Sequence, residues 1–170
     1  ADFLTKNTNL DEKVEAVIIA SPQITHLKIA LMALSLGKHV FCEKPLGVSV
    51  EDGKKMVAAA EKSGAVNMMG FNYIRTPASQ FVRKLVSEGE IGDITWFRGE
   101  HTEDFYSDPN IPATWRATGL ENGTMGDLAP HMINAALAIM GPIKSLSADV
   151  ATVHSSRPGG TVDNDDHAQM

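Results

Sequence analysis

Three short apolar segments recur along this chain at a nearly constant spacing, and this repeat constrains the fold more than any other feature. The segments are residues 14–20, 39–42 and 65–71, and their starts lie 25 and 26 residues apart. They are rich in the residue types that favour strands, and the stretches between them have helical spacing. Such alternation with short connections is typical of parallel strands joined by right-handed crossovers. We therefore predict a βαβαβ unit with helices covering the faces of its sheet.

The stretches between these segments carry helix boundary signals. Residues 24–36 place apolar side chains at positions 27, 30, 31 and 34, which is one face of a helix, and Gly37 follows as a stop. A second helix is predicted after Ser49, which is a good capping residue, and it should end before Gly64. A third helix is predicted over about residues 77–87.

The regular alternation of strand and helix patterns ends after Gly92. We place a domain boundary near residue 75, which gives domains at 1–75 and 76–170. Residues 94–103 are predicted to form a long strand, residues 124–140 a helix and residues 143–153 another strand. Residues 104–122 are predicted to be a loop, and its 19 residues exceed the usual connection between elements. The predicted fold class is an α/β unit followed by an α+β unit.

Composition excludes several classes of function. The net charge of −6 leaves no broad basic face, so we expect neither nucleic acid nor an anionic membrane as a partner. The longest apolar stretches fall well short of the roughly 20 residues that a bilayer requires. The single cysteine, Cys42, cannot form an internal disulfide or a thiolate metal cage, and we interpret it as a core residue in a cytoplasmic protein.

Polar residues directly follow each of the three predicted strands. Ligands of parallel sheets gather at the carboxyl ends of the strands, so these residues are candidates for a binding site. Each has a structural alternative as a helix cap, a solvated side chain or a turn residue, but together on one edge they favour a site. The candidates are Ser21, Pro22 and His26, then Glu43, Lys44 and Pro45, and finally Asn72 and Arg75.

A second group of candidates is Asp127 and His131, which stand four residues apart and so share one face of the predicted helix. A histidine held by a carboxylate is suited to act as a general base on an alcohol. The structural alternative is that Asp127 favours the amino end of the helix while His131 is a satisfied core residue. A metal site with His101 or His154 as further ligands is a weaker alternative, because no paired-histidine metal motif is present.

Several motifs together resemble one known family. Residues 14–22 (VEAVIIASP) and 37–46 (GKHVFCEKPL), followed by Gly92-Asp93-Ile94, Trp115-Arg116 and the stretch from Gly126 to His131, closely resemble the Gfo/Idh/MocA family of NAD(P)-dependent oxidoreductases. The resemblance implies the later half of a doubly wound parallel Rossmann sheet, and then the start of an α+β domain with a mostly antiparallel sheet. It also implies a segment of a longer protein, whose glycine-rich phosphate-binding turn would precede Ala1.

The resemblance assigns roles to individual residues. Lys44 corresponds to the active-site lysine, Asp127 holds a substrate hydroxyl, and His131 is the acid/base, so these three are the implied catalytic residues. A departure from the family pattern is Asn134, where relatives often have Asp. The implied cofactor-binding residues are Ser21, Pro22, His26, Glu43, Lys44, Pro45, Trp115 and Arg116, and the implied substrate-binding residues are Lys44, Asn72, Arg75, Asp127 and His131.

The resemblance therefore implies hydride transfer between NAD or NADP and a hydroxyl-bearing carbon of a sugar or polyol, with no metal. It also implies a homo-oligomer, either a dimer or a tetramer. Three alternatives stay open: a non-catalytic dinucleotide-binding regulator on the same fold, an NAD-dependent glycosidase, and a 170-residue segment that is inactive by itself.

Overall fold

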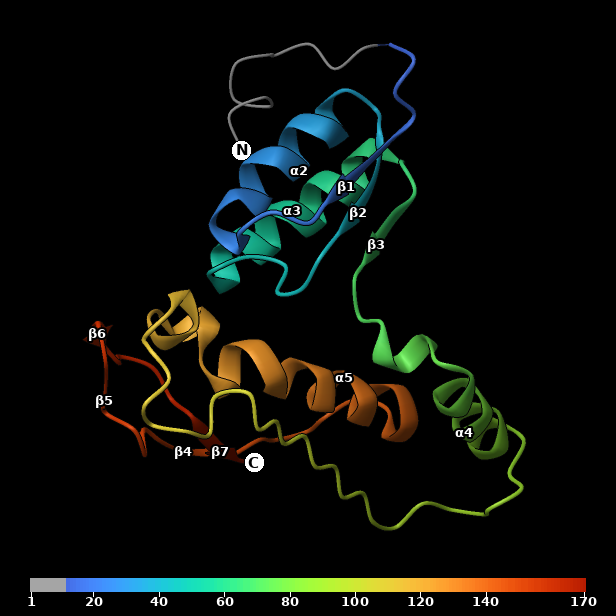
Figure 1. Cartoon of the computed structure of the whole chain (residues 1–170). Helices are drawn as coiled ribbons and strands as arrows, with labels where there is room; N and C mark the ends of the chain where they lie inside the picture. Colours follow the sequence, from blue (N-terminus) through green and yellow to red (C-terminus); the bar gives the residue numbers. More distant parts are fainter. Residues whose placement is uncertain (1–11) are drawn as a thin grey trace. The chain divides into compact units, whose positions relative to one another are not determined.

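The computed structural model describes residues 12–170, which divide into two compact units (Figure 1). The first unit ends at Phe71 and the second begins at Asn72. The boundary that we predicted near residue 75 lies at the end of a short 3-10 turn, η2 (Tyr73–Arg75). This turn contacts helices of the second unit, so the chain enters that unit a few residues before the predicted position.

Three parallel strands form the sheet of the first unit, as predicted. They are β1 (Ala16–Ile19), β2 (His39–Cys42) and β3 (Asn67–Met69), in the order β1-β2-β3. Ile19 is paired with Cys42, and Cys42 with Met69, so the three strands end at the same level. The residues that follow the strands therefore emerge at one edge of the sheet.

The two helices of the first unit begin and end near the predicted positions. A 3-10 turn, η1 (Gln23–Thr25), leads into α2 (His26–Ser35), and α3 spans Val50–Ser63. Ser49 Oγ accepts a hydrogen bond of 3.1 Å from the backbone N–H of Asp52, which confirms the predicted cap. Gly64 ends α3 with a φ of 65°, a left-handed conformation that glycine adopts without strain.

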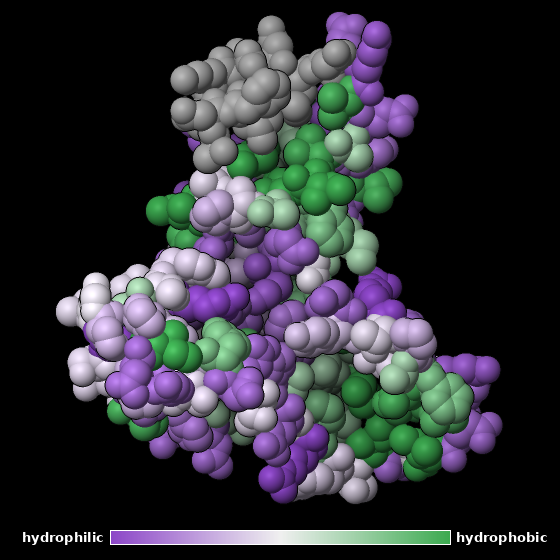
Figure 2. Space-filling view, viewed as in Figure 1, coloured by the Kyte–Doolittle hydropathy of each residue, from purple (hydrophilic) through white to green (hydrophobic). Residues whose placement is uncertain are grey.

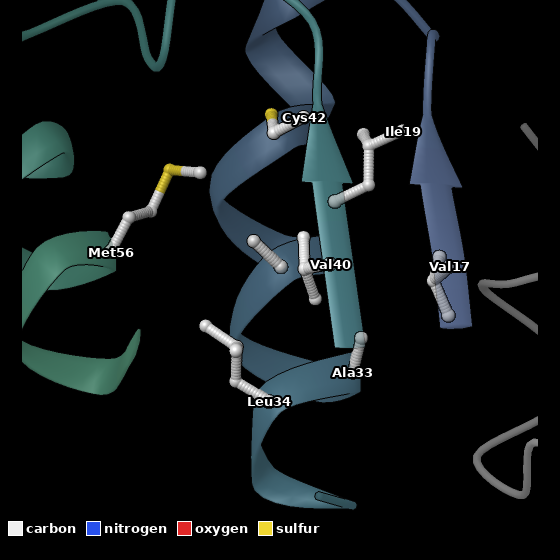
Figure 3. Packing of buried hydrophobic residues seen from close by; sticks show 8 residues of the cluster. Val17, Ile19, Ala33, Leu34, Val40, Cys42 and Met56 are labelled. Atoms are coloured by element: carbon white, nitrogen blue, oxygen red, sulfur yellow. The ribbon is translucent and has the colours of Figure 1, made fainter. Parts of the chain in front are cut away.

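Both helices cover the same face of the sheet (Figure 1). Inward side chains from the strands pack against α2 and α3 to form the core of the unit (Figure 3). The other face is open in residues 12–71, since Ile18 is 74% exposed. The expectation of helices on both faces is therefore wrong for this part of the chain. Right-handed crossovers that advance in one direction across a sheet place every helix on one side, and only a reversal of strand order changes the side.

The second unit combines helices with short antiparallel strands. Three short 3-10 turns, of which η2 is the first, and a five-residue π-helical turn precede its longest helix, α5. Three of its strand segments, β5, β6 and β7, were not predicted. The elements are α4 (Pro77–Ser87), η3 (Trp115–Ala117), η4 (Leu120–Asn122), η5 (Thr124–Leu128), α5 (Ala129–Met140), β4 (Asp149–Ala151), β5 (Ser156–Arg157), β6 (Gly160–Thr161) and β7 (His167–Gln169).

Two predicted strands of the second unit differ from the structure. Residues 94–103 form no strand, and only Asp149–Ala151 of the predicted strand over 143–153 is paired, with β7. A strand persists only where a neighbour takes up its backbone hydrogen bonds, and no segment within residues 12–170 pairs with residues 94–103. Trp96 is consequently 80% exposed. The green areas of the surface in Figure 2 mark exposed residues of high hydropathy, mainly aliphatic ones.

The helices that the structure describes in residues 12–170 are all too short or too polar to cross a membrane.

The environment of Cys42 leads to a chemical prediction. Burial, and to a smaller extent the neighbouring Glu43 carboxylate, raises the pKa of this thiol to about 11 from an ordinary value near 9.0. Its thiolate fraction at pH 8 is then about 100-fold lower than for an ordinary cysteine, because each pKa unit is a factor of ten. We expect iodoacetamide to label Cys42 of the native protein at least about 100-fold more slowly than in urea, as measured by mass spectrometry of its peptide.

The same shift links stability to pH. The folded pKa lies above the unfolded one, so the contribution of the neutral thiol is complete below about pH 9 and is lost as the pH rises towards 11. Rapid labelling of the native protein at pH 8 would contradict both the burial and the raised pKa.

Candidate functional site

In the first unit, the candidate residues lie at the carboxyl ends of β1 and β2. Ser21 follows β1, and its hydroxyl lies 2.5 Å from that of Thr25 at the start of α2. The backbone N–H of Thr25 donates to the Pro22 carbonyl, which closes the turn between strand and helix. Lys44 follows β2, is half-buried, and is joined to Pro45 by a cis peptide bond. The predicted gathering of these residues at one edge of the sheet is present within this unit.

His26 connects the two turns that carry these residues. Its imidazole is 1% exposed, with Nδ1 lying 2.9 Å from the Pro45 carbonyl oxygen and Nε2 lying 2.9 Å from that of Ser21. Both ring nitrogens therefore face the backbone of this unit. The geometry makes His26 a support for the Lys44–Pro45 turn.

Glu43 lies against the end of the third strand. A Cβ atom added to Gly70 would lie 2.8 Å from Glu43 Oε2, so the carboxylate packs directly over the glycine backbone. A side chain at position 70 would therefore displace the Glu43 carboxylate from this position. Asn72 and Arg75, the candidates that follow β3, belong to the second unit and are exposed there.

In the second unit, Asp127 lies in the π-helical turn η5, and Arg116 Nη1 donates to its Oδ2. The Arg116 guanidinium lies over the Trp115 ring at 4.3 Å and over the Phe105 ring at 5.2 Å. Stacking on two rings and pairing with a carboxylate hold a planar guanidinium in one orientation. Arg116 thus fixes the carboxylate of Asp127.

His131 lies in the first turn of α5, one helical turn after Asp127, and is 7% exposed. Its ring centroid lies 4.4 Å from that of Tyr73 and 6.0 Å from that of His101. His101 Nε2 lies 2.9 Å from Glu103 Oε1. The imidazole of His131 therefore lies among aromatic rings, a packing that restrains its plane.

Asn134 lies one turn further along α5. Its Oδ1 is buried, and no residue in the described part of the chain donates a hydrogen bond to it. An aspartate at this position would carry a negative charge, whereas the asparagine amide is neutral and accepts hydrogen bonds through its oxygen alone.

A cavity of about 320 Å³ lies beside Arg116 and Asp127, with Phe105, His154 and Asn164 also in its wall. Aromatic rings with a few converging polar groups are the usual lining of a small-molecule site. Among residues 12–170, no group of three His, Cys, Asp or Glu side chains could hold a metal ion. His101 and His154, the further ligands of the metal alternative, therefore belong to no metal-binding group in the described structure.

Sequence reasoning missed several residues of this region. Tyr73, between the candidates Asn72 and Arg75, was not predicted as a site residue. Its ring is nevertheless closer to that of His131 than the ring of His101 is. The Pro158-Gly159 dipeptide, a common turn signal, marked the β5–β6 hairpin. The turn-forming residues 163–166 bind the backbone around Arg116 and Asp127, and their Asp and Asn types, common in turns, were the signal that could have marked them.

Comparison with known families agrees with this geometry. Residues 3–71 match the model described as "Oxidoreductase family, NAD-binding Rossmann fold", and residues 79–170 match the "GFO/IDH/MocA C-terminal domain". The chain belongs to the Gfo/Idh/MocA oxidoreductase family. The resemblance inferred from its motifs is confirmed, as is the predicted fold class.

Named members of the Gfo/Idh/MocA family are similar to this chain. The levoglucosan dehydrogenase of Pseudarthrobacter phenanthrenivorans is 39% identical over 150 residues, which cover 87% of this chain and 38% of that protein. The scyllo-inositol 2-dehydrogenase (NADP(+)) of Bacillus subtilis is 30% identical, over 82% of this chain and 38% of that protein. The chain thus spans about two fifths of the length of these relatives.

A solved structure of levoglucosan dehydrogenase, in complex with NADH and levoglucosan, superposes with a TM-score of 0.86 at 38% identity. The similarity covers 93% of this chain and 44% of the solved chain. A Gfo/Idh/MocA fold is therefore shared across nearly the whole of the chain.

The turn that carries Asp127 depends on Gly126. A Cβ atom at this position would lie 2.4 Å from the Leu120 carbonyl oxygen, a backbone atom that cannot move independently. We expect Gly126→Ala to lower the free energy of unfolding by about 1–3 kcal/mol or more through overpacking, as measured by urea denaturation.

Gly53→Ala is the matched control, because Gly53 lies within α3 and its added Cβ would meet only Leu46 Cδ2 at 3.9 Å. Alanine there should raise stability by roughly 0.5–1 kcal/mol. Equal effects of the two substitutions would disprove the packing argument.

Proposed function

We propose that the protein is an NAD(P)-dependent dehydrogenase that oxidises a CH–OH group of a sugar or polyol. The observation that carries the proposal is the placement of Asp127 in the turn that leads into α5 and of His131 in the first turn of α5, with Asp127 held by Arg116 and His131 nearly buried. Both residues stand where the family resemblance assigns a substrate-binding carboxylate and an acid/base.

The first unit fits part of a dinucleotide. Its parallel strands end at one edge, and the turns there present the hydroxyls of Ser21 and Thr25 and the half-buried Lys44. Such an edge is where nucleotides bind in open parallel sheets. We assign Ser21, Pro22, Glu43, Lys44 and Pro45 to the cofactor. Trp115 and Arg116 are assigned to cofactor or substrate binding, as the family resemblance implies.

His26 belongs to the same assignment in a different role. Its two ring nitrogens face the carbonyls of Ser21 and Pro45, so it supports the cofactor-binding turns from within the unit.

A bound nicotinamide supplies the acceptor for the hydride that leaves the carbinol carbon. His131 accepts the hydroxyl proton at a ring nitrogen, so that the oxygen can form a carbonyl. Lys44 carries the role that the family resemblance assigns to it, a cation that stabilises negative charge as it develops on a substrate oxygen. Asp127 accepts a hydrogen bond from a neighbouring hydroxyl and so orients the reacting carbon, and Asn72 and Arg75 contribute to the substrate pocket.

Relatives with this fold support the substrate class. One is named for levoglucosan and another for scyllo-inositol, and both are uncharged molecules bearing several hydroxyl groups. The proposed cofactor is NAD or NADP, since one similar protein is named for NADP(+) and a similar solved structure contains NADH. A cytoplasmic homo-oligomer is the expected form, and the exposed apolar surface around Trp96 offers area for association.

The proposal predicts the effect of removing Lys44. In the full-length protein, Lys44→Ala should lower kcat by roughly 100- to 1,000-fold, a far larger effect than its weakening of cofactor binding, measured as Kd. Reduced nicotinamide absorbance with a panel of sugars and polyols measures the first quantity, and fluorescence titration measures the second. Net accumulation of reduced cofactor also separates a dehydrogenase from a glycosidase.

Lys54→Ala is the control for this substitution, because Lys54 is an exposed lysine of α3 that is not among the candidate site residues. It should leave both constants unchanged. A Lys44→Ala variant with full turnover would overturn the role of the lysine.

The role of His131 predicts a change in pH dependence. His131→Asn should lower kcat by roughly 100- to 10,000-fold, because a general base is lost. The fall of kcat/KM at acidic pH should also disappear, since the group whose protonation blocks proton transfer is gone. An unchanged acid limb in the residual activity would assign the base to another residue.

A further inference from the structure

Residues 163–166, between β6 and β7, bind the segment that carries Arg116 and Asp127. The bonds link residues about 40 to 50 positions apart in the chain, and they join side chains of the acidic segment to backbone groups of residues 116–125. We call this segment the 163–166 clamp.

Asn164 is the centre of the clamp. Its side chain is buried, with the residue 4% exposed, and Nδ2 donates to the Arg116 carbonyl at 2.8 Å and to the Gly119 carbonyl at 3.2 Å. An amide nitrogen has two N–H bonds, so both are used. The carbonyl of the residue that holds Asp127 is therefore bound to a side chain nearly fifty positions away in sequence.

The two neighbours of Asn164 bind the same segment with the opposite polarity. Asp163 Oδ1 accepts from the Gly119 N–H at 2.7 Å, and Asp165 Oδ2 accepts from the Met125 N–H at 2.7 Å. The Asp165 carbonyl also accepts from the Thr124 N–H at 2.9 Å. Asp165 thus satisfies two amides at the start of the π-helical turn that contains Asp127.

The fit between the clamp and this turn is tight. A Cβ atom on Gly123 would lie 2.3 Å from Asp165 Oδ1. Residues 115–128 form only short 3-10 and π-helical turns, whose backbone groups need partners from outside the segment. The clamp supplies several of those partners, which fixes the path of the backbone on both sides of the Arg116–Asp127 ion pair.

We propose that Asn164 is a positioning residue for the proposed dehydrogenase reaction: it holds the Arg116 backbone so that the guanidinium meets Asp127 and aims that carboxylate at the substrate. The inference rests on the function proposed above. It requires an amide at position 164, because a carboxylate of the same shape would set oxygen against two carbonyl oxygens.

The first test is kinetic and uses the full-length protein. Asn164→Asp and Asn164→Ala should each lower kcat/KM for the sugar or polyol by roughly 10- to 100-fold, as expected when a substrate-orienting group is displaced. Arg116→Ala should have a similar effect. If Asn164 acts through Arg116, the Asn164→Ala/Arg116→Ala double variant should match Arg116→Ala within about twofold. Independent, multiplicative losses would overturn the proposal.

The second test does not depend on activity. Hydrogen exchange of the Gly119, Thr124 and Met125 amides should accelerate at least about tenfold in Asn164→Asp, while exchange in α2 and α3 stays unchanged. Asn110→Ala is the matched control, because Asn110 is exposed and the bonds described for it go to Asp108 alone. It should alter neither exchange nor kinetics.

The outcomes separate the clamp from the proposed function. If the unsubstituted protein oxidises no sugar or polyol, the proposed function is wrong. The hydrogen-exchange experiment then decides by itself whether the clamp holds residues 119–125. Unchanged exchange at residues 119–125 in Asn164→Asp would overturn the clamp whatever the activity. Local loosening together with non-additive kinetics supports both.

Discussion

Parallel pairing of three short strands is the constraint on which the rest of the first unit depends. Because β1, β2 and β3 end in register, the turns after β1 and β2 emerge at the same edge and bring Ser21 and Lys44 there. The same pairing requires crossover helices, and the core between sheet and helices keeps the strands in place. His26 then links the two turns through their carbonyls, so a buried side chain joins the packing of α2 to the position of the Lys44 loop.

The second unit meets a different constraint, because its site lies on irregular backbone. The turns around Arg116 and Asp127 cannot satisfy their own amides and carbonyls as a regular helix does. Side chains of Asp163, Asn164 and Asp165 take that role. Loops that carry function are usually held by a more regular scaffold, and here the scaffold includes an acidic segment next to β7.

The proposed chemistry divides between the two units. The first carries the lysine that would stabilise the developing oxyanion, and the second carries the carboxylate and the imidazole. The Arg116–Asp127 pair orients the carboxylate, which is what recognition of a substrate hydroxyl needs. Because these side chains are already held in place within one unit, less conformational entropy is lost when substrate binds.

The sequence by itself determined the βα repeat, the helix boundaries at Ser49 and Gly64, the family, and the candidates Lys44, Asp127 and His131. These rest on local signals: residue spacing, capping chemistry and short motifs. Only the tertiary structure decided that residues 94–103 lack strand pairing, that α2 and α3 share one face, and that Asn164 holds Arg116. Those features depend on which distant backbone groups become partners, and hydrogen bonding between segments 40 to 50 residues apart leaves no periodicity in the sequence.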